Sequence, residues 1–173
     1  MISTRTLFAA LILSATVALP AAAQTNPCAT SGCSVTDKVT LKVNPLVRLS
    51  LSQTATALNS PDTTAYDAGS STTAGPTVSV KANRSWSLTV KAGASAFTPL
   101  LGAAGYNKPA GDLGVKIAGG STVAGLSTTA ASLASGTSGG VFTGAVTYTT
   151  KFDWTKDIPD DYTMDVVYTI TAP

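Results

Sequence analysis

The most restrictive feature of this sequence is an alternation of apolar and polar residues with a period of two, repeated along most of the chain. Successive side chains of a β-strand point to opposite faces, so this alternation is typical of strands with one buried face. Trp86, Leu88 and Val90, for example, alternate with Ser87 and Thr89. After residue 23 the sequence shows no convincing apolar repeat of an amphipathic helix. The pattern therefore predicts an all-β fold.

Hairpins are predicted at two places in the second half of the chain. The alternating run at 113–117 is followed by Gly119-Gly120, which is a two-residue hairpin signal because such turns favour positive φ. Two further runs, at 142–154 and 162–170, flank an acidic turn at 157–161. We expect these two runs to pair with each other as an antiparallel hairpin.

Two regions closer to the N-terminus are less regular. Apolar residues of one parity recur on both sides of Asn44-Pro45, at Val35, Val39, Leu41, Val43, Val47, Leu49 and Leu51. This stretch is either two strands with a turn at the proline or one long kinked strand that passes between two sheets, and we favour the kinked strand. Residues 54–76 carry few large apolar groups and predict a long surface connection, with a short strand near Tyr66 as an option.

Together the runs predict an antiparallel two-sheet β-sandwich of the immunoglobulin-like kind, with 7–9 strands. Aromatic residues make up only 6% of the chain, which disfavours the aromatic girdles of a small outer-membrane barrel. Both tryptophans lie in phase with apolar neighbours, so we expect them in the core. The predicted core residues are Trp86, Leu88, Val90, Val146, Tyr148, Phe152, Trp154, Met164, Val166, Tyr168 and Ile170.

The first 23 residues have the pattern of a secretory signal peptide. Arg5 precedes an apolar run at 7–13, and the segment ends in the small residues Ala21-Ala22-Ala23. We expect cleavage after Ala23, followed by an N-terminal segment at 24–34 and a single β-sandwich domain at 35–173. The mature chain is then exported to the cell surface, the periplasm or the extracellular space, and we expect no transmembrane segment in it.

Cys28 and Cys33 are the only cysteines, and four residues separate them. Disulfides persist in exported proteins, so we predict a bridge that closes this short loop. A tetrahedral metal site needs further ligands, and the chain has no other Cys and no His to supply them.

Composition excludes several classes of function. Without His the chain has no Ser-His or Cys-His nucleophile system, and its Asp, Lys, Tyr, Ser and Thr residues form no recognisable catalytic spacing. We therefore expect no enzyme and no cofactor. The formal net charge of +2 gives no basis for a nucleic-acid interface.

Two groups of residues are candidate binding sites. Asp157, Asp160 and Asp161 form a dense carboxylate cluster, which we interpret as a solvated turn, with a calcium site as the weaker alternative. Trp86 and Trp154 are the candidates for stacking on a glycan, although their phase favours the core for both.

The segment Ser85-Trp86-Ser87-Leu88-Thr89-Val90 resembles the W-x-L segment of bacterial surface WxL-type β-sandwich domains, and Phe97 with the glycine-rich stretch after it resembles the next part of those domains. That family carries a second W-x-L near its C-terminus, whereas Trp154-Thr155-Lys156 keeps only the tryptophan. The ending at 158–173 is similar to the closing hairpin of secreted bacterial β-sandwiches, including pilin-like and spore-coat-like subunits. The resemblance implies a noncatalytic role at the cell surface.

The sequence thus leads to two hypotheses about function. The first is a structural or interaction protein that contacts other surface proteins or copies of itself, with the segment from Val35 to Leu51 as the donor in β-strand addition. The second is a module that binds an envelope glycan through exposed aromatic side chains.

Overall fold

The computed structural model describes residues 32, 34, 36–102 and 106–172, which fall into two units, 1–42 and 43–173. In the first unit the described residues have no regular secondary structure and are exposed. The predicted strand from Val35 therefore fails in its first part, because no described residue before Val47 lies in a strand. The predicted signal peptide, Cys28 and Cys33 lie outside the described residues.

The second unit is mostly β, as predicted. It has one short helix, α1 (Thr63–Asp67), and a single 3-10 turn, η1 (Ala110–Asp112), among its described residues. Its strands are β1 (Val47–Leu51), β2 (Ser70–Ala82), β3 (Trp86–Ala92), β4 (Thr98–Pro99), β5 (Leu113–Ile117), β6 (Thr122–Val123), β7 (Ala131–Gly136), β8 (Gly140–Lys151), β9 (Tyr162–Thr163) and β10 (Val166–Thr171).

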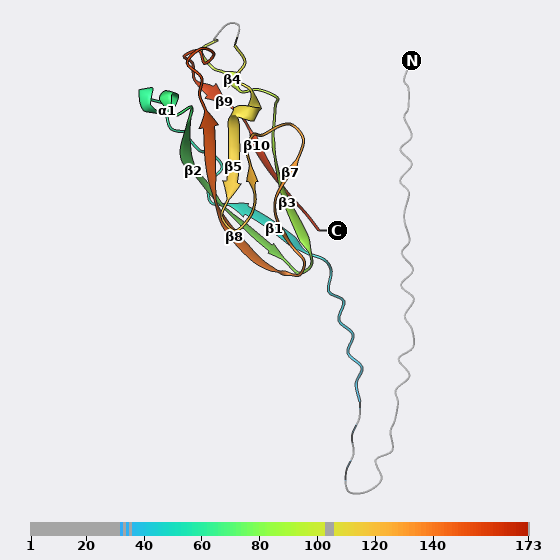
Figure 1. Ribbon diagram of the computed structural model, residues 1–173. Coiled ribbons are helices and arrows are strands. Elements are labelled where there is room, and N and C mark those ends of the chain that lie inside the picture. Colours follow the sequence, from blue (N-terminus) through green and yellow to red (C-terminus); the bar gives the residue numbers. More distant parts are fainter. Residues whose placement is uncertain (1–31, 33, 35, 103–105, 173) are drawn as a thin grey trace, which may run out of the picture. The chain divides into compact units, whose positions relative to one another are not determined.

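These strands form three antiparallel sheets (Figure 1). The first has five strands in the order β1-β2-β8-β5-β6, the second has three in the order β10-β3-β7, and β4 pairs with β9. The long strands β2 and β8 run side by side from Ser70 opposite Lys151 to Ala82 opposite Gly140, with a shift of register between Ala74 and Thr77. β5 and β6 form the predicted hairpin, but its turn is longer than the two residues expected, because Lys116 pairs with Thr122, and Gly119 has a positive φ of 75° whereas Gly120 does not.

One hydrophobic cluster takes side chains from both larger sheets, which is what the alternation of each strand requires. Five of the predicted core residues are buried: Trp86, Leu88, Val90, Val146 and Tyr148. Four more pack against the cluster but are only half-buried, namely Met164, Val166, Tyr168 and Ile170. All four come from the last segment of the chain, β10 and the residues just before it.

Trp154 and Phe152 depart from the core prediction. Trp154 is 59% exposed, and Phe152 is half-buried but does not belong to the core cluster. The physical reason is that β8 ends at Lys151, so the alternation that places a side chain inward no longer applies to the turn that follows.

Two predictions of topology are also wrong. β8 and β10 do not form a hairpin, because β8 pairs with β2 and β5 while β10 pairs with β3 in the other sheet. The region 54–76 is not a connection throughout, since α1 contains Tyr66 and β2 begins at Ser70. Asp62 caps α1 by accepting a hydrogen bond from the Ala65 amide at 2.8 Å, which explains a helical turn where the alternation is weak.

Candidate functional site

A groove of about 1110 Å³ opens beside β10, between that strand and the irregular segment 53–61. Leu51, at the end of β1, lies at one border, and Phe152, just beyond β8, is also part of the lining. The apolar lining includes Leu51, Leu58, Phe97, Leu113, Tyr148, Met164 and Val166. This concave surface borders the hydrophobic core directly.

The groove exists because the core is covered incompletely on this side. Inward side chains of the central strand β3 are buried, with Leu88 and Val90 fully inaccessible. The inward side chains of the edge strands β1 and β10, such as Leu51 and Val166, are only half-buried. β1 and β10 approach each other, but no ladder of hydrogen bonds joins these two strands. An additional strand placed here would cover apolar surface that is partly exposed in the described fold.

The two sheets are connected across this opening by a pair of tyrosines. The hydroxyl oxygens of Tyr148, on β8, and Tyr168, on β10, lie 3.0 Å apart, and both residues line the groove. Burial raises the pKa of both phenols, and for Tyr168 the hydrogen bond with Tyr148 raises it further. Both side chains therefore remain neutral at physiological pH, and their hydroxyl groups are bonded to each other.

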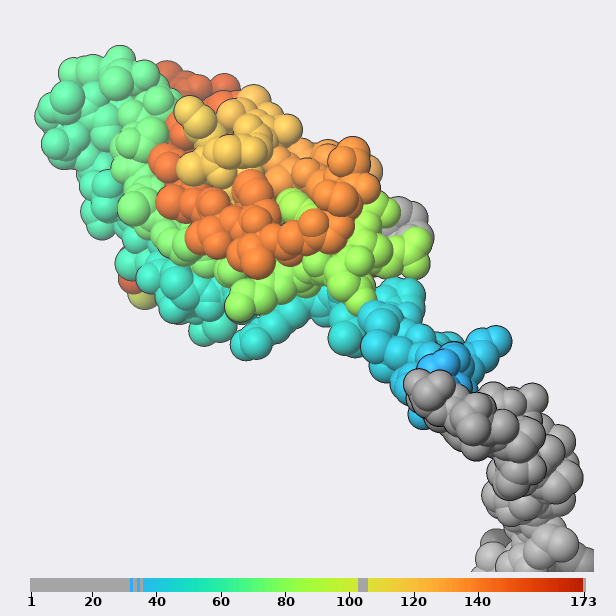
Figure 2. Space-filling view, turned by 90° about the horizontal axis from the view of Figure 1, so that it is seen from below, coloured from blue at the N-terminus to red at the C-terminus, as the bar shows by residue number. Residues whose placement is uncertain are grey.

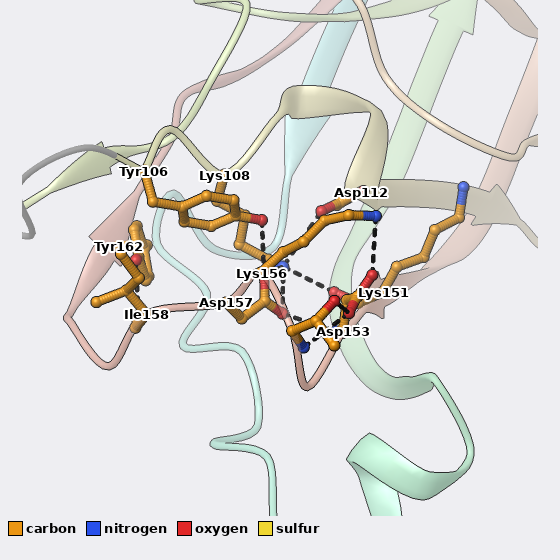
Figure 3. Close-up of polar contacts among 10 residues, drawn as sticks. Tyr106, Lys108, Asp112, Lys151, Asp153, Lys156, Asp157, Ile158 and Tyr162 are labelled. Carbon is orange, nitrogen blue, oxygen red and sulfur yellow. Dashed lines mark hydrogen bonds and ion pairs between the residues drawn. The ribbon is translucent and has the colours of Figure 1, made fainter.

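Lys108 is one of the residues that line the groove, and Figure 3 shows its polar contacts. Its side chain is 5% exposed, and its ammonium group donates to both carboxylate oxygens of Asp157 at 3.0 Å and to the Lys151 carbonyl at 2.8 Å. The same nitrogen lies 3.3 Å from Asp112 and 5.2 Å from the centre of the Phe152 ring. A buried cation with these partners ties the segment before η1 to the end of β8 and to the turn after it.

Asp157 is the centre of this cluster. Its side chain is 5% exposed, and it accepts hydrogen bonds from the Tyr106 hydroxyl at 2.7 Å and from the Asp153 amide at 3.1 Å, besides those from Lys108. Burial and the bond to Asp157 raise the pKa of Tyr106. Nearby, hydrogen bonds from Lys156 and Thr155 hold the pKa of Asp153 well below its usual value.

Asp157 and Asp160, two of the three residues of the weak calcium-site candidate, make hydrogen bonds within the chain. The oxygens of Asp157 already accept hydrogen bonds from an ammonium and a phenol, and Asp160 accepts from the backbone amides of Leu100 and Leu101. Within the part of the chain that the structure describes, no three side chains of His, Cys, Asp or Glu are grouped as a metal site requires. Asp157 therefore acts as the partner of a buried lysine, and Asp160 holds the 100–101 backbone.

The lining of the groove is acidic overall. Its charged residues are one lysine, Lys108, and four aspartates, Asp157, Asp160, Asp161 and Asp165, which gives a formal charge of −3. Asp161 and Asp165 are exposed. The acidic rim thus favours an occupant with positive charge on its polar face.

A second surface feature is an aromatic patch made of Trp154, Tyr66 and Phe152. The rings of Tyr66 and Trp154 lie 4.5 Å apart at 32°, and those of Tyr66 and Phe152 lie 5.3 Å apart. The Trp154 indole donates to Asp67 at 3.1 Å. This contact fixes the ring while leaving much of it accessible, so of the two tryptophans Trp154 is the one that can meet a ligand.

The first residues of the second unit are held by Asn83, which lies between β2 and β3. The Asn83 side chain accepts from the Leu46 amide and donates to the Asn44 carbonyl, both at 2.8 Å. Figure 2 shows this end of the molecule from below, with the orange atoms of the β7–β8 region beside the green atoms of β2 and β3. These bonds of Asn83 fix residues 44 and 46, which precede β1, to the turn between β2 and β3.

The residues before this point display apolar side chains at alternate positions. Val39 and Leu41 are each 83% exposed, and Val43 is 70% exposed. Lys38, Thr40 and Lys42 occupy the positions between and beside them. The alternation found in the sequence is thus present without a partner strand among the described residues.

Sequence reasoning identified this segment and the acidic turn but missed the groove and Lys108. Asn107-Lys108-Pro109 looks like an ordinary polar loop, and a groove that depends on where two sheet edges diverge leaves no local pattern. Comparison of the chain with known protein families, with characterised proteins and with solved structures found no match. Among the residues that the structure describes, no helix has the length and apolar character needed to cross a bilayer.

Proposed function

We propose that this protein is a noncatalytic structural subunit, exported to the cell surface, that assembles by β-strand addition. Its fold in this proposal is an immunoglobulin-like β-sandwich, and its donor is the segment 36–43, here called the donor segment. The proposal narrows the sequence expectation, because Val47–Leu51 is already paired with β2 and so is not free to act as a donor.

A single observation carries the proposal, namely the exposure of alternating apolar side chains in the donor segment. Val39, Leu41 and Val43 are exposed, and in a strand they would lie on one face and be buried if the segment joined a sheet. Complete burial of a Val or Leu side chain contributes about 1.5–3 kcal/mol. Burial of three such side chains would therefore strongly favour pairing of the donor segment with a sheet. Backbone hydrogen bonds to an edge strand would add to this gain.

Placing charge on the apolar face of the donor segment is expected to abolish assembly. We predict that the wild-type mature protein forms oligomers, whereas the Val39→Asp/Leu41→Asp double variant remains monomeric. Size-exclusion chromatography with light scattering measures the mass of both proteins. A deletion of 24–43 should have the same effect as the double variant.

The control is Thr40→Asp, which puts one carboxylate on the opposite, polar face of the segment and should still assemble, because the apolar face is unchanged. A wild-type protein that stays monomeric at high concentration would contradict the proposal. Oligomers that persist in the double variant would contradict it equally.

The exposed Trp154 favours a second candidate function, a module that binds an envelope glycan through its aromatic patch. Because Trp86 is only 6% exposed, a change in tryptophan emission on adding solubilised envelope polysaccharide would report on Trp154. For this function we expect the emission to shift in the wild type and not in Trp154→Phe. Emission that polysaccharide leaves unchanged would exclude glycan binding by this patch.

A further inference from the structure

We propose that the groove beside β10 is the acceptor for the donor segment of a second copy of this chain, so that copies join head to tail. This inference rests on the proposed strand addition and adds the site of insertion and the direction of assembly. Its basis is the placement of the groove, its half-buried apolar lining and its charge.

The register of the first sheet places the groove and the exit of the donor segment towards opposite ends of the fold. Val47, which follows the donor segment, pairs with Ala82, and Ala82 pairs with Gly140 at the start of β8. The groove lining includes Thr150 and Phe152, at the far end of β8 and just beyond it. The 12 residues of β8 span roughly 36 Å at about 3.3 Å per residue.

The donor segment and the groove both present apolar side chains. A strand of five residues measures roughly 17 Å and presents three side chains to one face, as Val39, Leu41 and Val43 do. The groove offers half-buried apolar side chains along one wall, at Met164, Val166 and Tyr168. Because β10 is hydrogen-bonded on one side to β3 and lies at the edge of its sheet, an added strand has a place to pair.

Charge favours the same pairing. The donor segment carries Lys38 and Lys42 on its polar face and one acidic residue, Asp37, which gives a formal charge of +1. The groove lining carries a formal charge of −3, with Asp161 and Asp165 exposed at its rim. Opposite charges of this kind orient an incoming strand and disfavour binding between two grooves.

An interface between two different surfaces has a structural consequence. The contact is heterologous, so each copy that accepts a donor still presents its own donor to the next copy. Because the donor segment leaves one end of the fold and the groove lies towards the other, we expect open chains of variable length instead of a closed two-fold dimer.

Blocking the groove is expected to stop assembly as completely as blocking the donor. We predict that Met164→Glu is folded but monomeric, since its carboxylate would face the apolar side of the inserted strand. Thr171→Glu, on an exposed position of β10 outside the groove, should assemble like the wild type. Circular dichroism and a thermal melt verify folding, and light scattering gives the mass.

Mixing the donor variant with the groove variant distinguishes a wrong acceptor site from a wrong mode of assembly. A 1:1 mixture of Val39→Asp/Leu41→Asp with Met164→Glu should give heterodimers only, because it contains one intact donor and one intact groove. If the donor variant is monomeric but Met164→Glu still assembles, strand addition stands and this acceptor is wrong. If neither variant loses assembly, both proposals are wrong.

Cysteine cross-linking tests the contact with a smaller change to the groove than a carboxylate makes. In a background with Cys28→Ser and Cys33→Ser, Leu41→Cys protein mixed with Met164→Cys protein should form covalent dimers on mild oxidation. Thr171→Cys in place of Met164→Cys should give none. Electron microscopy of the wild type should show chains of variable length, and a population made of closed dimers would overturn the proposed direction of assembly.

Discussion

Replacing Lys108 with methionine is expected to lower the free energy of unfolding by about 3–5 kcal/mol, because it leaves a buried carboxylate without its cation. Asp157 is 5% exposed at its side chain, so water does not replace the lost ammonium group. The Lys151 carbonyl loses its donor as well. Urea denaturation followed by circular dichroism measures the change, and Asp157→Asn should be destabilising for the same reason.

The matched control is the exposed pair of Lys156 and Asp153. Their atoms lie 2.8 Å apart, closer than those of Lys108 and Asp157, but the side chains are 68% and 41% exposed. We expect Lys156→Met to leave the denaturation midpoint unchanged within error, since exposed ion pairs contribute little. Equal effects of Lys108→Met and Lys156→Met would show that burial does not set the importance of the first pair.

The size of this effect depends on the segments that the buried pair connects. Lys108 lies before η1, Lys151 ends β8, and Asp157 belongs to the turn beyond it, so one ammonium group fixes three segments of the chain. The same turn forms part of the groove lining. A loss of the pair should therefore also weaken assembly, if the groove is the acceptor that we propose.

The strands could be predicted from the sequence, but their partners could not. Alternation is a local property, and it located β3, β5 and β8 because each has one buried face. Which strand pairs with which depends on long-range packing, so the runs that became β8 and β10 looked like a hairpin although they belong to different sheets. The groove depends on this topology, so only part of the candidate site could be predicted from the sequence.

The donor segment also shows that an alternating pattern does not by itself determine strand pairing. Its alternation predicts a strand, and the prediction fails because a strand exists only when its amide and carbonyl groups pair with a neighbour. None of the described residues supplies that neighbour for Val39 or Leu41, which remain exposed. The alternation thus indicates that the segment can pair as a strand, and we propose that a second copy supplies the partner strand.

The two tryptophans test most directly how burial affects stability, because the sequence analysis expected both of them in the core. Trp86 is 6% exposed and its ring lies 5.5 Å from that of Phe142, so Trp86→Ala should lower the free energy of unfolding by about 3–5 kcal/mol. Trp154 is 59% exposed, so Trp154→Ala removes one ring contact and one hydrogen bond and should cost about 1 kcal/mol or less. Urea denaturation followed by circular dichroism compares the variants without relying on the fluorescence that each has lost. Similar losses for both would mean that the turn after β8 is as tightly integrated in the fold as β3, contrary to the difference in burial between the two rings.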